Sequence, residues 1–146
     1  MASEIVKESI IADADVDTIM DVVADLEQYP QWQEGVKEVE ILETDDDGWA
    51  TRARLVVQGV GMTSYMVIEY QYTDNAMSWR LVESDKLAKS DGSYTMNDRG
   101  DGTTEVIYEL EVAPSISLPG VVRRQIARKI VDNALKGLQS RLSEMN

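Results

Sequence analysis

The sequence lacks two residue types that carry much of protein chemistry, cysteine and histidine. Without cysteine there are no disulfides, thiolate nucleophiles or cysteine metal sites. Without histidine the chain lacks the commonest general base and the commonest transition-metal ligand. Catalysis by a Ser-His-Asp triad and zinc hydrolysis are therefore excluded in their usual forms, and we expect neither a metal site nor a cofactor.

Basic residues are also scarce, with 14 Lys and Arg against 27 Asp and Glu and a net charge of −13. Because phosphate binding needs a basic face, this balance argues against a nucleic-acid partner. The charge is uneven: residues 121–146 carry a net +4, so the first 120 carry −17. A basic segment of this kind can contact an anionic membrane or ligand. We interpret it mainly as an offset to the acidic body.

Long apolar runs are absent as well. No stretch approaches the roughly 20 residues needed to cross a bilayer. The first eight residues lack a basic region followed by an apolar one, which a signal peptide requires. We therefore predict a cytoplasmic protein without stable membrane insertion. Its 146 residues are the size of one domain, and we assign 1–146 to a single unit.

Alternation of apolar and polar residues dominates most of the chain and predicts strands with one wet and one apolar face. In the last strand, for example, Val106, Tyr108 and Leu110 share the side opposite Glu109. Such strands fit an antiparallel sheet that is covered on one side. The predicted strands are 5–11, a strand containing 39 and 41, and 49–58, 62–72, 77–83, 89–97 and 103–112.

Helical spacing appears in two places. Val16, Ile19 and Val23 predict a short amphipathic helix that ends before Tyr29-Pro30, since a residue preceding proline avoids the helical region. A second short turn is expected over 29–35. After Pro119, apolar residues recur every four positions and predict a helix of about seven turns. Gly137 within it suggests close packing or a slight bend.

The order of one strand, two short helices, six strands and a long helix resembles the START-like superfamily, which includes polyketide cyclase/dehydrase proteins. Residues 25–32, Asp-Leu-Glu-Gln-Tyr-Pro-Gln-Trp, look like that family's D-x-x-x-Y-P-x-W element. Residues 69–72, 92–96 and 113–119 are similar to its actinobacterial members. The resemblance implies an α+β helix-grip fold, a seven-stranded antiparallel sheet wrapped around the long helix, with a hydrophobic tunnel between them.

The tunnel gives the apolar face a second interpretation besides a dry core. Tyrosine and tryptophan carry polar tips that need partners, which is awkward in a dry core but useful in a binding pocket. Methionines on the same face suit either interpretation. Trp32 either forms part of a lid or seals the core. The residues predicted to line a pocket are Trp32, Thr51, Met66, Tyr70, Trp79, Tyr94, Tyr108, Val122, Ile126 and Ile130.

Two functions follow from these features. The first is binding or transport of a hydrophobic small molecule, such as a lipid, an isoprenoid quinone or an aromatic polyketide, by a monomer or weak homodimer. The alternative is a polyketide cyclase/dehydrase, an aromatase that acts on a poly-β-ketone. Without histidine its proton carriers would have to be Tyr, Glu, Asp or Lys, or an Arg stabilising an enolate. Glu34 and Glu83 are the nearest carboxylates, with no motif behind them, so we assign no catalytic residue and favour binding.

Overall fold

The computed structural model describes residues 2–59 and 61–145 and confirms the α+β helix-grip fold. Each predicted strand is present, and β4 has the predicted bounds. The strands are β1 (Glu4–Ala12), β2 (Val36–Thr44), β3 (Ala50–Gly59), β4 (Met62–Tyr72), β5 (Ala76–Ser84), β6 (Leu87–Asp98) and β7 (Thr104–Pro114). The helices are α1 (Val16–Ala24), the 3-10 helix η1 (Leu26–Gln28), α2 (Tyr29–Trp32) and α3 (Gly120–Glu144).

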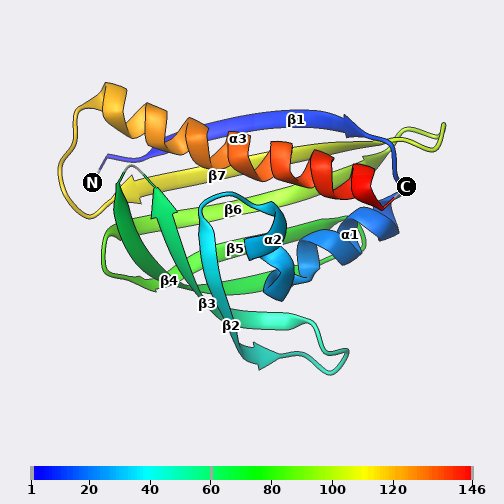
Figure 1. Ribbon diagram of the computed structural model, residues 1–146, viewed down its shortest axis with the longest axis horizontal. Coiled ribbons are helices and arrows are strands. Elements are labelled where there is room, and N and C mark those ends of the chain that lie inside the picture. Colours follow the sequence, from blue (N-terminus) through cyan, green and yellow to red (C-terminus); the bar gives the residue numbers. More distant parts are fainter. Residues whose placement is uncertain (1, 60, 146) are drawn as a thin grey trace.

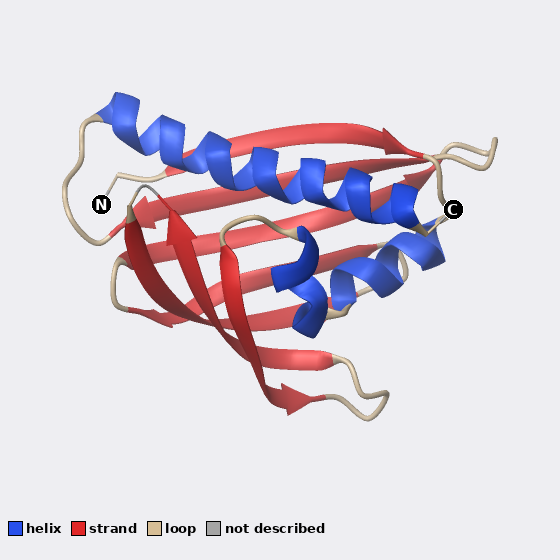
Figure 2. Cartoon of the chain, viewed as in Figure 1, coloured by secondary structure: helices blue, strands red, loops and turns tan. Residues whose placement is uncertain are grey.

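All seven strands form one antiparallel sheet in the order β1-β7-β6-β5-β4-β3-β2. The first strand pairs with the last, so β1 forms one edge of the sheet beside β7. Figure 1 shows the sheet curling, with α3 lying across its concave side close to β1. Figure 2 shows the short helices α1 and α2 on that same side, below α3. One face of the sheet is thus covered, as the alternation predicts.

The segment between β1 and β2 is held by local hydrogen bonds. The Asp15 carboxylate caps α1 by accepting from the Thr18 backbone N–H at 2.8 Å. At the other end of α1, the Tyr29 hydroxyl donates to the Val23 carbonyl at 2.5 Å and is itself buried. This bond ties α2 to α1. The Tyr29-Pro30 pair therefore starts a new short helix with a fixed position.

α3 packs on the sheet through a stripe of buried residues, among them Val131, Leu135, Leu138 and Leu142. Gly137 lies directly against α2, because a Cβ built there would come within 2.1 Å of the Trp32 carbonyl oxygen. The close-packing interpretation of this glycine is therefore correct. None of the described helices combines the length and the apolar character needed to span a membrane.

The convex face of the sheet is charged and wet. Glu69 accepts from Arg52 and, at 2.7 Å, from Arg80, and the two guanidinium groups hold the pKa of its carboxyl below the usual value. Arg54 stacks over the Tyr65 ring, 4.9 Å from its centroid. These arginines lie on the face that the sequence assigns to solvent.

Candidate functional site

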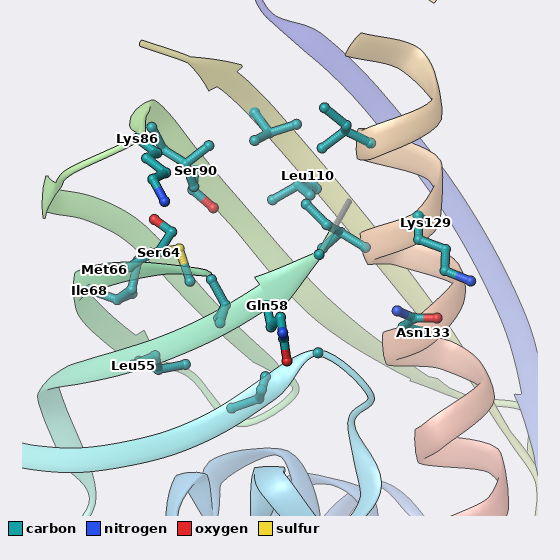
Figure 3. A pocket seen from close by; sticks show the side chains of 18 of the residues that line it. Leu55, Gln58, Ser64, Met66, Ile68, Lys86, Ser90, Leu110, Lys129 and Asn133 are labelled. Atoms are coloured by element: carbon teal, nitrogen blue, oxygen red, sulfur yellow. The ribbon is translucent and has the colours of Figure 1, made fainter. Parts of the chain in front are cut away.

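A cavity of about 420 Å³ lies between the concave face of the sheet and α3. Its wall is mostly apolar, with Leu55, Ile68 and Leu110 on the sheet and Ile126 and Ile130 on the helix. Figure 3 looks into it, with the strands on one side and Lys129 and Asn133 of α3 on the other. This volume falls within the range of about 300–1,000 Å³ that is typical of small-molecule sites.

The inner part of the cavity has an aromatic floor, formed by Tyr70, Trp79, Tyr94 and Tyr108. The pairing register of the strands explains why these four residues lie together. Tyr70 pairs with Trp79 across β4 and β5, and Tyr94 pairs with Tyr108 across β6 and β7. The rings of Tyr94 and Tyr108 meet edge to face with centroids 4.8 Å apart. Such contacts fix the rings' orientation and add to the energy of burial.

Gly92 joins the two halves of this floor. It sits opposite Trp79 on the neighbouring strand, and a Cβ there would approach the indole within 2.7 Å. With no side chain at Gly92, the indole lies over β6 and reaches Tyr108 on β7, at a centroid separation of 5.4 Å. The glycine is needed here for close approach and not for its backbone angles.

The floor contains hydroxyl groups and no charged side chain. The Tyr94 hydroxyl is buried and has no hydrogen-bond partner among the described residues. Burial raises the pKa of Tyr70, Tyr94 and Tyr108 well above the ordinary value, and the neighbouring tyrosines raise that of Tyr70 and Tyr94 further. All three are therefore neutral hydrogen-bond donors at physiological pH. As bases they are too weak to remove a proton from carbon.

Many of the polar residues that line the cavity lie at its mouth. We define the mouth as the exposed lining residues, which come from four loops and α3. These are Glu34, Gln58, Gly59, Met62, Asp85, Lys86, Ser115, Ile116 and Lys129. Asn133 of α3 donates to the Glu34 carbonyl at 3.4 Å, so the helix and the α2–β2 loop meet at this rim. Figure 3 shows Ser64, Lys86 and Ser90 grouped on the strand side of the opening.

Seven of the ten predicted pocket residues line the cavity in the structure. They are Met66, Tyr70, Trp79, Tyr94, Tyr108, Ile126 and Ile130. The alternation in β4–β7 and the four-residue spacing in α3 place them there. The structure puts the other three, Trp32, Thr51 and Val122, elsewhere.

Trp32 packs under α3 and closes the core. Its backbone carbonyl touches Gly137, and its ring meets Tyr29 edge to face at 5.1 Å. Tyr29, three residues earlier and on the inner side of the short helix, lines the cavity in its place. Of the two roles considered for Trp32, this position matches the core seal.

Thr51 does not line the cavity because the strand alternation is broken at that point. The pairing of β2 with β3 shifts register between Ile41 and Thr44, as in a β-bulge, and Ala50 turns inward in place of Thr51. Thr51 instead borders a depression beside Glu69 and Arg80. Val122 lies one turn before Ile126 but is not part of the lining, and the next residue of α3, Arg123, lines the cavity instead.

Several lining residues were not predicted, including Tyr29, Leu55, Ser64 and Ser90. The contact of Gly92 with the Trp79 indole was not predicted either. Leu55 carried a signal, since it shares the apolar face of β3. The serines carried none, because a small polar residue near a strand end looks like any other exposed position. Of the two carboxylates considered, Glu34 lies at the mouth, whereas Glu83 accepts from the Tyr65 hydroxyl at 2.8 Å and is not part of the lining.

The model of the family described as polyketide cyclase/dehydrase and lipid transport matches residues 12–139. The chain belongs to this family. A comparison with curated proteins found no match. Solved structures with the same fold include a START superfamily protein from Mycobacterium smegmatis, at 24% identity and a TM-score of 0.90, covering 97% of this chain and 99% of that one.

Two further structures are similar over nearly the whole chain. The Zhui aromatase/cyclase from a Streptomyces species has 17% identity and a TM-score of 0.81, covering 98% of this chain and 93% of its own. A Thermus thermophilus protein has 20% identity and a TM-score of 0.80, covering 98% and 99%. At these identities the likeness shows the fold, and function has to be argued from the cavity.

Proposed function

We propose that this protein binds a hydrophobic small molecule in the cavity between the sheet and α3 and does not transform it. The observation that carries the proposal is the cavity itself, about 420 Å³ of mostly apolar space that opens to the surface. Burying apolar ligand surface there contributes about 25 cal/mol per Å². Lipids, isoprenoid quinones and aromatic polyketides all offer such surface.

The chemistry of the lining favours binding over cyclase activity. A cyclase must remove a proton from a carbon beside a carbonyl, which needs a base near the bound carbon chain. The carboxylates that line the cavity, Glu34 and Asp85, are exposed at the mouth, and a hydrogen bond from Ser64 lowers the pKa of Asp85. The buried tyrosines have raised pKa values and remain protonated. No described group at the floor is suited to take the proton.

The test of binding uses N-phenylnaphthylamine, an uncharged fluorophore that brightens in apolar surroundings. Titration of the wild-type protein is expected to give saturable fluorescence. Ile126→Trp adds a large side chain to the cavity wall and is expected to weaken binding about tenfold or more, which corresponds to about 1.4 kcal/mol. Gln125→Trp, on the exposed side of the same helix, is the matched control and is expected to leave affinity unchanged. Equal affinities for the two variants would contradict binding inside the cavity.

The test of turnover incubates the protein with a reactive poly-β-ketone analogue and compares the products with a protein-free control. We expect the spontaneous product distribution in both. A faster, regiospecific cyclisation that Tyr70→Phe or Tyr94→Phe abolishes would establish the cyclase alternative. Native mass spectrometry of the protein purified from its own host would identify the class of the natural ligand.

A further inference from the structure

The two ends of the molecule differ in charge. Because neighbouring strands run in opposite directions, the loops fall into two groups at opposite ends of the sheet (Figure 1). One group joins β1 to α1, β2 to β3, β4 to β5 and β6 to β7. The charged residues of these four loops are all exposed, and they are Asp13, Asp15, Asp45, Asp46, Asp47, Asp74, Arg99 and Asp101. This end of the protein is therefore strongly acidic.

The opposite end, where the cavity has its mouth, is not acidic. Its loops join β3 to β4, β5 to β6 and β7 to α3, and their only charged residues are Asp85 and Lys86. α3 begins at this end, and residues 120–129 contain no acidic residue and the four basic residues Arg123, Arg124, Arg128 and Lys129. Of these four, Arg123 pairs with Glu4, and the other three are exposed without an ion pair among the described residues. The basic residues are thus concentrated beside the mouth.

The same end exposes large apolar side chains. Met62 is the first residue of β4, Ile116 lies in the β7–α3 loop and is 61% exposed, and Val121 lies in the first turn of α3. Met62 and Ile116 also line the cavity. Exposed apolar side chains beside unpaired basic ones are the combination that binds a bilayer surface. The apolar groups enter the boundary of the acyl chains, and the cations are attracted to anionic headgroups.

A lipid surface fits this end better than an acidic protein partner does. The three apolar residues stand on separate segments around an open mouth and do not form one continuous patch. A fluid bilayer adapts to side chains spaced in this way, whereas a protein would need a matching pocket for each. Charge also favours one orientation, because anionic headgroups attract the basic end and repel the acidic end.

We propose that the mouth end of the protein docks on a membrane surface that contains anionic lipids. Met62, Ile116 and Val121 enter the interface, and the unpaired basic residues of α3 lie close to the headgroups. The mouth of the docked protein faces the bilayer. An apolar ligand can then pass between bilayer and cavity without crossing bulk water, a consequence that rests on the proposed binding function.

Co-sedimentation with vesicles tests the docking. One set of vesicles contains equal parts of phosphatidylglycerol and phosphatidylcholine, and the other contains phosphatidylcholine alone. We expect the wild-type protein to bind the anionic vesicles at about 50 mM NaCl and to lose most of this binding at about 500 mM, because salt screens the attraction. Binding to the neutral vesicles is expected to be much weaker. Equal binding to both kinds of vesicle would overturn the proposal.

Paired charge variants test the position of the docking surface. Arg124→Gln/Arg128→Gln is expected to weaken binding to anionic vesicles by about fivefold for each arginine, or about 25-fold. Lys136→Gln/Arg141→Gln removes the same charge from the second half of α3 and is the matched control. It is expected to stay within about twofold of the wild type, because those residues lie farther from the surface than the range of screened charge. Equal losses in the two variants would overturn the docking by the mouth end.

The apolar contribution is tested by Ile116→Ser, which is expected to weaken vesicle binding about fivefold. Met145→Ser is the control, because Met145 is 55% exposed at the other end of α3. It is expected to leave binding unchanged. An Ile116→Ser protein that binds as well as the wild type would overturn insertion at the mouth.

N-phenylnaphthylamine titration without vesicles separates this proposal from the binding function. A wild-type protein that binds the fluorophore but not the anionic vesicles would overturn the docking and leave ligand binding intact. Vesicle binding without fluorophore binding would support the docking and overturn the ligand proposal. Self-association at about 50 mM NaCl in place of vesicle binding, measured by analytical ultracentrifugation, would assign the basic end to the acidic end of a second copy and overturn the membrane proposal.

Discussion

At the scale of single residues, the site depends on a glycine, Gly92, at a position where a side chain would not fit. Gly92 carries no Cβ, and the indole of Trp79 occupies the space above it. A Cβ at Gly92 would also lie 2.6 Å from the Glu109 carbonyl oxygen, so the indole and this carbonyl together leave no room for a methyl group. Backbone cannot move aside as a flexible side-chain end can.

Gly92→Ala is therefore expected to displace Trp79 from Tyr108 and to destabilise the protein by about 1–3 kcal/mol, the usual cost of overpacking. Urea denaturation measures the loss, and near-ultraviolet circular dichroism reports the changed ring contacts. Gly59→Ala is the control, because a Cβ there meets no atom within 4 Å. Equal stability of the two variants would show that the indole does not rest on Gly92.

Where a strand keeps its alternation, residues that the sequence places on the apolar face lie on the cavity wall. Tyr70, Tyr94 and Tyr108 were assigned to the cavity because each lies on the apolar side of an unbroken strand. Thr51 was misplaced because the shift in pairing between β2 and β3 reverses the alternation there. That shift depends on how β2 and β3 pair with each other, and it cannot be predicted from the apolar and polar alternation of either strand alone.

At the scale of elements, the contact between α3 and α2 sets how closely the long helix approaches the short one. Gly137 touches the Trp32 backbone, and Tyr29 and Trp32 pack against each other beside it. Glycine lowers the stability of a helix interior, so its presence at position 137 indicated a close contact or a bend there. It did not identify the partner, because α2 has only four residues and weak helical signals.

Gly137→Ala tests this contact through the sign of its effect. In an open helix the change stabilises by about 1 kcal/mol, because alanine has the higher helix propensity. Here the new Cβ would meet the Trp32 carbonyl, so we expect a loss of stability and a larger separation of α3 from α2. Ser140→Ala, exposed on the same helix, is expected to be close to neutral. A stabilised Gly137→Ala protein would contradict the close contact.

At the scale of the whole molecule, buried tyrosines link folding to alkaline pH. Burial raises the pKa of Tyr29, Tyr70, Tyr94 and Tyr108 well above 10.0, and that of the half-buried Tyr72 to about 12. In the unfolded chain these hydroxyls ionise near pH 10. Above that pH the unfolded state binds fewer protons than the folded state, so stability falls as pH rises.

The free energy of unfolding is therefore expected to decrease steeply between about pH 10 and about pH 12, by about 1.4 kcal/mol per pH unit for each fully protonated buried tyrosine. Urea denaturation at a series of pH values measures this slope. The hydrogen bond to Glu83 also raises the pKa of Tyr65, so all six tyrosines resist ionisation in the folded state and most of the rise in tyrosinate absorbance is expected to accompany unfolding. Ionisation of all six in the native protein without loss of stability would contradict the burial described here.

The overall architecture could be predicted from the sequence because the apolar patterns of its strands and its long helix extend over many residues. Six strands of regular alternation and a seven-turn apolar stripe leave few ways to cover one face of a sheet, and the fold prediction is confirmed. The volume of the cavity was not accessible. It depends on the curvature of the sheet, which arises from the pairing of all seven strands together.

The order of the sheet has a last consequence, for self-association. α3 lies alongside the edge strand β1, but β2 forms the opposite edge with no strand beyond it (Figure 1). An unpaired edge is a template for joining sheets from two copies, and charged side chains are the usual protection. Glu38, Glu40 and Glu43 are all exposed on β2, so antiparallel joining of two such edges would bring acidic side chains together. The repulsion between these side chains therefore protects the β2 edge from joining the same edge of a second copy.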